Sequence, residues 1–338
     1  MQRNIYWIDH IKSVCIFLVV YGHALSTSPL IKNAIYTFHL PVFLAVTGFL
    51  NASTLSGMGA GRKVYAQTRY YFYLYIFFSV VASIVWYLLE ARSESILRIL
   101  GPLVGMAYGL HGPDLKLMHN NDPLWYFPFL ISSTVLSYIF YLLFRASWAW
   151  LAITISLILS APLWTSFPPL PWSFDIAPLG AIFIGVGLGV RFLYDGYSRL
   201  FEKLTSPLMM FLYVSIWLSG GLFNGVVNIN GRLWGDSWWL FLICAASAIF
   251  GLVSILKRVP VLAISTELSK HTLLIFCSHI YLTKIIVRLT PRIPNGLQDV
   301  FVFFSAVFVT FVCYKFSVVM QPVLIRWLKP SVRVANCK

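Results

Sequence analysis

Ionisable side chains interrupt the first apolar segment of this chain, where charge is costly. Lys12 and His23 lie in residues 8–25, a stretch otherwise rich in aliphatic side chains. At about 100° per residue, their spacing puts both on one face of a helix, roughly 16 Å apart along its axis. Imidazole takes up and releases protons near neutral pH, so His23 is a candidate general base. Lys12 is a candidate for the same functional face, because ionisable groups inside a membrane are functional candidates by default.

Two further ionisable residues accompany this pair. Asp9 precedes Lys12 by three residues, within side-chain reach on a helix, and could partly neutralise it. His39 begins the next apolar segment, and a hairpin with its midpoint near Ile31 would place it at the same depth as His23. Structural roles are the alternatives: Asp9 and Lys12 could anchor the helix at the interface, and His39 could serve packing or hydrogen bonding.

The elements that must position these residues are membrane helices. Hydrophobic residues make up 59% of the 338-residue chain and charged residues only 11%, whereas soluble domains are about 25% charged. A span needs roughly 20 mostly apolar residues. Ten segments meet this requirement, at residues 8–25, 34–50, 64–89, 124–144, 148–164, 176–194, 208–227, 237–256, 264–286 and 298–322. We therefore predict an all-α, polytopic bundle of about ten helices, forming a single membrane domain over residues 1–338.

The basic residues predict the orientation of this bundle. With the N-terminus inside, 15 of the 25 Lys and Arg residues fall on the inner side and 8 on the outer side. Because cytoplasmic loops collect Lys and Arg, both termini are expected in the cytoplasm. The net charge of +14 is then a consequence of topology and lipid contact, and we expect no nucleic-acid partner. The five cysteines lie apart in sequence, so neither a metal site nor a disulfide framework is expected.

Two other segments carry local predictions. Apolar residues recur at helical spacing near residues 96–103, which indicates an interfacial helix in the long outer loop. The glycine-rich stretch "GAIFIGVGLGV" lacks the lysine and context of a phosphate loop. Its Gly185 and Gly189 instead fit close helix packing.

The first hairpin resembles a known family. "IDHIKSVCIFLVVYGHA" followed by "FHLPVFLAVTGFL" is similar to the opening of the membrane acyltransferase-3 family, in particular its fucose O-acetylase-like branch. That family has a basic residue and a histidine separated by ten residues, a pattern that Lys12 and His23 match. Many members have arginine at the position of Lys12, so the charge is kept but the bidentate fork is lost. The second helix of the family ends in SGF, where this chain has Thr47 in place of serine.

Later segments extend the resemblance over most of the chain. A basic stretch follows the second helix in the family, and Arg62, Lys63 and Arg69 occupy that place. "NDPLWYFPFL" resembles the LWFL segment, and "LSKHTLLIFCSHIYLTK" resembles a late helix that also ends in a histidine, here His279. Ten helices are the usual core of the family.

The resemblance implies transfer of an acyl group, usually acetyl, from cytoplasmic acetyl-CoA to a hydroxyl of a surface polysaccharide or lipid-linked glycan. It implies a protein of the bacterial inner membrane, without an appended soluble domain and without a metal. His23 would take the hydroxyl proton during direct transfer, or would itself be acylated first. His39 would orient His23, stabilise the oxyanion or bind the acceptor.

Donor and acceptor are expected at opposite ends of the bundle. Arg62, Lys63 and Arg69 would hold the donor phosphates on the inner side, with Lys12 near the pantetheine arm. Ordinary positive-inside charge is the alternative for Arg62 and Lys63.

The acceptor side is expected to be the outer one. Acceptor binding is assigned to Asp122, Trp125 and Tyr126, since aromatic rings cover sugar faces and carboxylates bind hydroxyls. An interfacial aromatic belt is the alternative for the two rings. His279 is expected in the outer half of its helix and is grouped with these acceptor-binding residues, with its exact role left open.

Two other classes of function compete with the enzyme. A secondary transporter or a flippase of lipid-linked glycans would also carry buried charges and proline-broken helices. A membrane scaffold would not explain the aligned ionisable groups. The sequence leaves the sugar, the modified position and the oligomeric state open.

Overall fold

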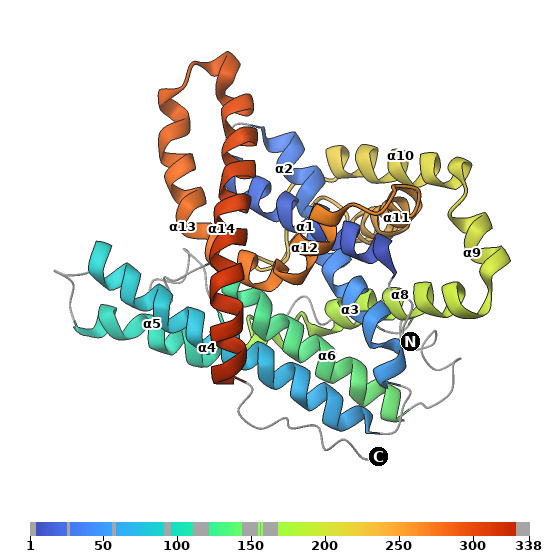
Figure 1. Ribbon diagram of the computed structural model, residues 1–338, viewed down its shortest axis with the longest axis horizontal. Coiled ribbons are helices and arrows are strands. Elements are labelled where there is room, and N and C mark those ends of the chain that lie inside the picture. The colour runs from blue at the N-terminus through green and yellow to red at the C-terminus, as the bar shows by residue number, and fades with distance from the viewer. Residues whose placement is uncertain are drawn as a thin grey trace.

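Helices dominate the computed structural model, which describes residues 5–25, 28–55, 59–90, 96–110, 122–143, 155, 157 and 168–328 (Figure 1). Their order is α1 (Tyr6–Ala24), α2 (Pro29–Tyr36), α3 (His39–Leu55), α4 (Ala60–Glu90), α5 (Ile96–Tyr108), η1 (Asp122–Trp125), α6 (Tyr126–Leu143), η2 (Pro171–Ser173), α8 (Ala177–Gly196), α9 (Ser198–Leu204), α10 (Pro207–Phe223), α11 (Trp238–Leu256), α12 (Ala263–Lys270), α13 (Thr272–Leu289), η3 (Thr290–Arg292), η4 (Asn295–Leu297) and α14 (Gln298–Leu328). Two short strands, β1 (Val227–Asn228) and β2 (Leu233–Trp234), pair antiparallel between α10 and α11.

The predicted all-α membrane bundle is confirmed. Eight of the ten predicted segments each correspond to one helix. The ninth, residues 264–286, covers two helices, α12 and most of α13, and the fifth, residues 148–164, lies almost wholly outside the described residues. Within the described part of the chain, seven helices are long and apolar enough to cross a membrane. An eighth span arises if α9 and α10, bent by 52° at their junction, count as one. The total of ten spans and the side of each terminus stay predictions.

Helix α1 lies at the centre of the bundle and packs against α3, α11, α12, α13 and α14. It is long enough to span a membrane, yet its ionisable residues keep its hydropathy below that of the other spans. Three of its side chains bind backbone carbonyls near α12, at 2.9, 3.1 and 2.7 Å: Tyr6 to Lys257, His10 to Pro260 and Ser13 to Ser265. These bonds satisfy polar groups that would otherwise be costly to bury.

Glycine allows α3 and α8 to pack backbone to backbone. A Cβ added at Gly187 would lie 1.8 Å from the Ala45 carbonyl oxygen, and one at Gly48 would lie 2.0 Å from that of Ile184. Both additions would force the helices apart, since real Cβ atoms do not approach so closely. The glycine-rich stretch is therefore a packing helix, as predicted. Its close contact falls at Gly187, however, whereas Gly189 has no atom within 4 Å.

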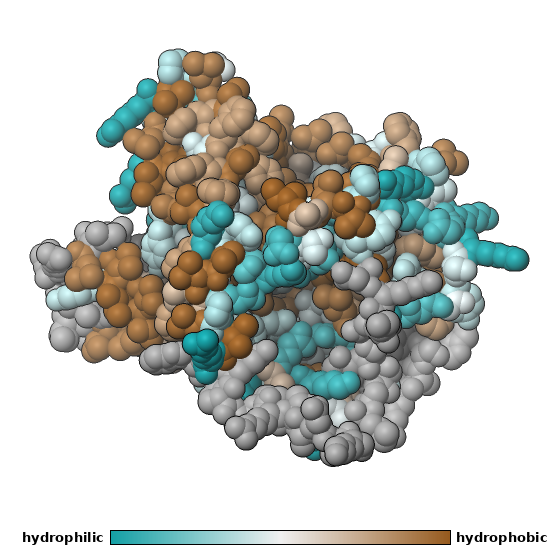
Figure 2. All heavy atoms as spheres, in the orientation of Figure 1, coloured by the Kyte–Doolittle hydropathy of each residue, from teal (hydrophilic) through white to brown (hydrophobic). Residues whose placement is uncertain are grey.

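The surface agrees with lipid contact. Figure 2 shows hydrophobic residues over the α13–α14 hairpin and along α4 and α5, while hydrophilic residues gather around α12 and α9. Phe304 and Phe308 on α14 are each 65% exposed. Large apolar side chains in such continuous exposure mark a surface that meets lipid or another apolar partner. The helix predicted near residues 96–103 is α5, which lies beside α4.

The two ends of α1 meet different neighbours. At its N-terminal end, Trp7 contacts Phe49 near the end of α3, with ring centroids 5.0 Å apart, and Tyr194 near the end of α8. At its C-terminal end, α1 meets the beginnings of α3 and α6 and the β1–β2 hairpin around a cavity. The antiparallel course of α1 and α3 therefore separates the bundle into two functional ends.

Candidate active site

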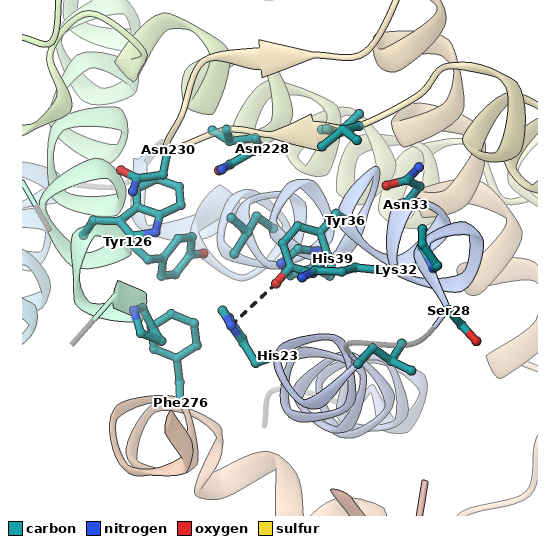
Figure 3. A pocket seen from close by; sticks show the side chains of 18 residues that line it. His23, Ser28, Lys32, Asn33, Tyr36, His39, Tyr126, Asn228, Asn230 and Phe276 are labelled. Atoms are coloured by element: carbon teal, nitrogen blue, oxygen red, sulfur yellow. Dashed lines mark hydrogen bonds between the residues drawn. The ribbon is translucent and has the colours of Figure 1, made fainter. Parts of the chain in front are cut away.

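A cavity of about 540 Å³ opens at the C-terminal end of α1. This volume falls in the range of small-ligand sites, about 300–1,000 Å³. Its walls come from α1, α2, α3, the η1–α6 junction, the β1 strand with its flanking residues, and α13 (Figure 3). The polar and aromatic side chains labelled there are His23, Ser28, Lys32, Asn33, Tyr36, His39, Tyr126, Asn228, Asn230 and Phe276.

His23 lies on the edge of this cavity, one residue before α1 ends, and its side chain is partly exposed. The Tyr36 hydroxyl lies 3.5 Å from His23 Nδ1, as the dashed line in Figure 3 marks. On its other side His23 meets the ring of His279, with centroids 5.1 Å apart. The imidazole is thus both accessible from the cavity and held between two side chains.

His39 and His279 share one tautomer. His39 Nδ1 lies 2.9 Å from the Ile35 carbonyl oxygen, and His279 Nδ1 lies 2.9 Å from that of Phe276. Since a carbonyl only accepts, each Nδ1 carries the proton and each Nε2 keeps its lone pair. The Nε2 of His279 is buried and has no hydrogen-bond partner among the described residues. Both histidines therefore present an acceptor nitrogen at the site.

Tyr36 links the groups on this side of the cavity. Its ring centroid lies 6.0 Å from that of His23 and 4.9 Å from that of His39. The ammonium of Lys32 lies 5.4 Å from the same centroid, one helical turn earlier on α2. The rings of His23 and His39 both pack against Tyr36, as their predicted similar depth requires.

Aromatic rings form the opposite wall. Trp125 and Tyr126 are buried where η1 meets α6, and both line the cavity. Tyr126 packs against Phe276 of α13, with ring centroids 5.2 Å apart. The two predicted acceptor residues therefore face the same space as His23. Asp122 begins η1, but its side chain lies outside the described part of the structure.

The other charged residues of α1 lie away from the cavity. Asp9 accepts a hydrogen bond of 2.7 Å from the Ser269 hydroxyl. Lys12 is half-buried and makes no hydrogen bond or salt bridge with described residues. The Asp9 charge still acts on the Lys12 ammonium, so the predicted partial neutralisation is electrostatic and involves no direct ion pair. Contact between α1 and α12 lets Ser269 reach the carboxylate from outside the helix.

The predicted donor residues lie on α4. Arg62 and Lys63 are exposed in its first turn. Arg69 donates from Nε to the Tyr73 hydroxyl at 3.2 Å, and its guanidinium covers the Tyr73 ring at 5.3 Å. None of the three lines the cavity. Because α4 begins where α3 ends, they belong to the end of the bundle that holds the start of α1.

Several cavity residues escaped the sequence analysis. Tyr36 and Lys32 lie on the short helix α2, and Asn228 and Asn230 lie at the β1–β2 hairpin. Lys32 and Tyr36 are four residues apart, which fits one helical face, but α2 is too short for this spacing to predict a helix. The hairpin offered no signal, because its two-residue strands carry no periodic pattern.

The fold and cavity define an integral membrane protein with a histidine-lined site. A profile of the acyltransferase domain family matches residues 5–315, which is most of the chain. The chain therefore belongs to the acyltransferase-3 family, and its general activity is acyl transfer. Neither the search of curated proteins nor that of solved structures found a match. The fucose O-acetylase-like branch stays a prediction.

Proposed function

We propose that this protein transfers an acetyl group from acetyl-CoA to a hydroxyl of a surface polysaccharide or lipid-linked glycan, in the bacterial inner membrane. The observation that carries the proposal is the His23 imidazole, which lines a ligand-sized cavity between Tyr36 and His279. Membership of the acyltransferase-3 family favours this chemistry over the transporter or flippase alternative.

In direct transfer, His23 acts on the acceptor hydroxyl. The imidazole takes the hydroxyl proton while the oxygen attacks the thioester carbonyl, forming the C–O bond. The C–S bond then breaks, and the departing thiolate takes the proton back from His23. The products are an ester on the glycan and CoA thiol. Positioned proton transfer of this kind contributes about 10²–10⁴ in rate.

The neighbouring histidines support this assignment. His39 presents an unprotonated Nε2, because its Nδ1 hydrogen is committed to the Ile35 carbonyl. A lone pair binds the acceptor hydroxyl but cannot stabilise an oxyanion, so acceptor binding is the role that suits His39 best. The Nε2 of His279 can accept a hydrogen bond from His23 once that ring is protonated. We assign His279 to positioning His23.

The acceptor would lie between the two walls of the cavity. Trp125, Tyr126 and Phe276 offer apolar rings to the faces of a sugar, and Asn228 and Asn230 offer amides to its hydroxyls. Asp122 begins η1, three residues before Trp125, and we assign it to acceptor binding because of this position in the sequence.

The donor would approach from the opposite end of α1. Arg62, Lys63 and Arg69 supply positive charge at that end, where the phosphates of acetyl-CoA would bind. Lys12 lies between this end and His23 on α1, where it could contact the pantetheine arm or a phosphate of the donor. The negative charge of Asp9 would partly neutralise that of Lys12. The thioester would thus reach His23 from the side away from the glycan.

Acetyl transfer by the purified protein tests the proposal. Protein in nanodiscs would receive radiolabelled acetyl-CoA and a lipid-linked glycan extract, and acetylated glycan and CoA thiol would both be measured. His23→Ala is expected to lose about 10²–10⁴ in turnover. His271→Ala, whose ring contacts Tyr314 outside the cavity, is the matched control. Full turnover by a folded His23→Ala protein would rule out the proposed base.

The same preparation separates the two chemical routes. Acylation of His23 before transfer would give a labelled protein when acetyl-CoA is added without acceptor. Direct transfer would leave the protein unlabelled under those conditions. Failure of acetyl-CoA to bind at all would instead favour the transporter alternative.

A further inference from the structure

The cavity carries a single formal charge. Of the described residues that line it, Lys32 alone is charged at neutral pH, apart from any protonated histidine, and none is Asp or Glu. The remaining polar groups are hydroxyls, amides and imidazoles. Among the described lining residues this cation therefore has no matching carboxylate, although charges that are partly removed from water are normally paired.

Lys32 is held in this position by an aromatic ring. Its ammonium lies 5.4 Å from the centroid of Tyr36, and its side chain is half-buried. It forms no hydrogen bond or salt bridge through its side chain with the described residues. In Figure 3 the side chain points into the cavity, toward Tyr36 and His39.

One acidic side chain, that of Asp299, contacts a residue of the cavity wall. Asp299, at the start of α14, accepts hydrogen bonds of 3.0 and 2.9 Å from the Ser28 hydroxyl. Ser28 lines the cavity but Asp299 does not, and no salt bridge joins Asp299 to Lys32. The cation–π contact alone is worth about 0.5–2 kcal/mol and brings no formal negative charge to the ammonium. An anion that enters the cavity would supply that charge.

We propose that the acceptor is an anionic saccharide and that Lys32 binds its negative group. The inference rests on the proposed function and adds the substrate class to it. A carboxylate of a uronic acid and a phosphate next to the sugar share this chemistry. Asn33, Asn228 and Asn230 also line the cavity, and their neutral amides suit the hydroxyls of the same sugar.

The donor phosphates are the other anions in the reaction. Arg62 and Lys63, at the far end of the bundle, are the proposed ligands of these phosphates. Lys32 instead lies on the same wall of the cavity as His23 and His39. Lys32 Nζ and the His23 ring both contact Tyr36, so the anion would bind close to the reacting hydroxyl. Binding of free CoA then serves as a separate arm of the test.

Equilibrium binding to the full-length protein in nanodiscs tests the inference without turnover. The probes are p-nitrophenyl β-glucoside, which is neutral, p-nitrophenyl β-glucuronide, which differs only by a carboxylate, and glucose 1-phosphate. At low salt, the wild-type protein is expected to bind the glucuronide, the phosphate or both at least about tenfold more tightly than the glucoside. The preference should shrink as ionic strength rises.

Three variants define the result. Lys32→Gln is expected to lose the preference while binding the neutral glucoside as before, and Lys32→Arg is expected to keep it. Lys284→Gln removes an exposed lysine of α13 outside the cavity and should behave like wild type. Melting temperatures confirm that each variant is folded.

Several outcomes would overturn the inference. Equal binding of charged and neutral probes by wild type would do so, as would a preference that survives in Lys32→Gln. Loss of free CoA binding in Lys32→Gln, with sugar binding intact, would assign the lysine to the donor. His23→Ala should lose acetyl transfer and retain the anion preference. If the wild-type protein shows the anion preference but transfers no acetyl group, that result would count against the proposed function and not against the anion site.

Discussion

At the residue scale, the site depends on which nitrogen of each histidine is free. Local backbone geometry fixes this for both His39 and His279. His39 Nδ1 reaches the Ile35 carbonyl near the end of α2, and His279 Nδ1 reaches carbonyls of the preceding turn of α13. The Nε2 of His279 is buried without a hydrogen-bond partner among the described residues, and its ring lies beside that of His23. If His23 is the base, as we propose, a neutral imidazole would stand where a catalytic triad has a carboxylate.

Under the proposed function, we expect His279 to support the chemical step more than substrate binding. His279→Ala is expected to lower kcat about 10- to 100-fold with little change in KM for acetyl-CoA or glycan. His279→Gln, whose side-chain oxygen can still accept a hydrogen bond, should recover part of kcat. Steady-state acetyl transfer by folded protein measures both constants. Equal loss in the two variants, or a rise in KM alone, would contradict the positioning role.

Part of this site could be predicted from sequence. The shared face of Lys12 and His23 follows from helical periodicity, and the matching depth of His39 follows from a simple hairpin. The contact between His23 and His279 could not be derived, because it depends on how α13 packs against α1 from the far end of the chain. For the same reason the sequence did not predict the hydrogen bond from Ser269 to Asp9, which exists beside the electrostatic interaction of Asp9 with Lys12.

At the element scale, the β1–β2 hairpin forms one wall of the cavity and is held by a buried ion pair. Arg232 donates from Nε to an Asp175 carboxylate oxygen at 2.7 Å, while Asp175 also accepts from the Leu170 backbone at 3.0 Å. Arg232 has a φ of 57°, a left-handed conformation that costs a non-glycine residue energy. The ion pair keeps it there, and Asn230 beside it lines the cavity.

Breaking this pair should both destabilise the protein and loosen the cavity wall. Arg232→Met leaves the Asp175 carboxylate, whose side chain is 1% exposed, without its cation, at a cost of about 3–5 kcal/mol. We expect a lower melting temperature and a raised KM for the glycan. Lys270→Met, which breaks an exposed pair with Glu267, should change the melting temperature little.

A double variant separates the ion pair from simple packing. Asp175→Asn combined with Arg232→Met removes both charges and should be less destabilised than the sum of the single variants. Thermal unfolding of the four proteins measures this coupling. Additive losses would show that the salt bridge does not hold the hairpin.

Elements differ in how well sequence predicts them. The long helices follow from continuous apolar length, because each must satisfy its own backbone inside the membrane. Helix α2 has eight residues and the strands have two, too short for periodicity to distinguish them from loops. These short elements nevertheless supply Lys32, Tyr36 and Asn228 to the cavity. Length, and not chemical importance, decided what could be predicted.

At the scale of the whole molecule, α1 connects two chemically different ends. The cavity with His23 lies at its C-terminal end, while Arg62 and Lys63 lie beyond the other end, after α3 has run back along it. The distribution of Lys and Arg along the chain predicts that the end with Arg62 and Lys63 is cytoplasmic. Acetyl-CoA is found on that side of the membrane. Donor and acceptor would then never compete for the same surface.

This separation predicts that the two substrates respond to different substitutions. Arg62→Ala combined with Lys63→Ala should raise KM for acetyl-CoA about tenfold, because charge-assisted contacts to phosphate are lost, and should leave KM for the glycan unchanged. Lys203→Ala, an exposed cation of α9 near the same end, is the matched control and should behave like wild type. Initial rates with each substrate varied in turn provide both constants. If the double variant matches Lys203→Ala, the basic residues of α4 serve topology alone, and the donor must enter by another route.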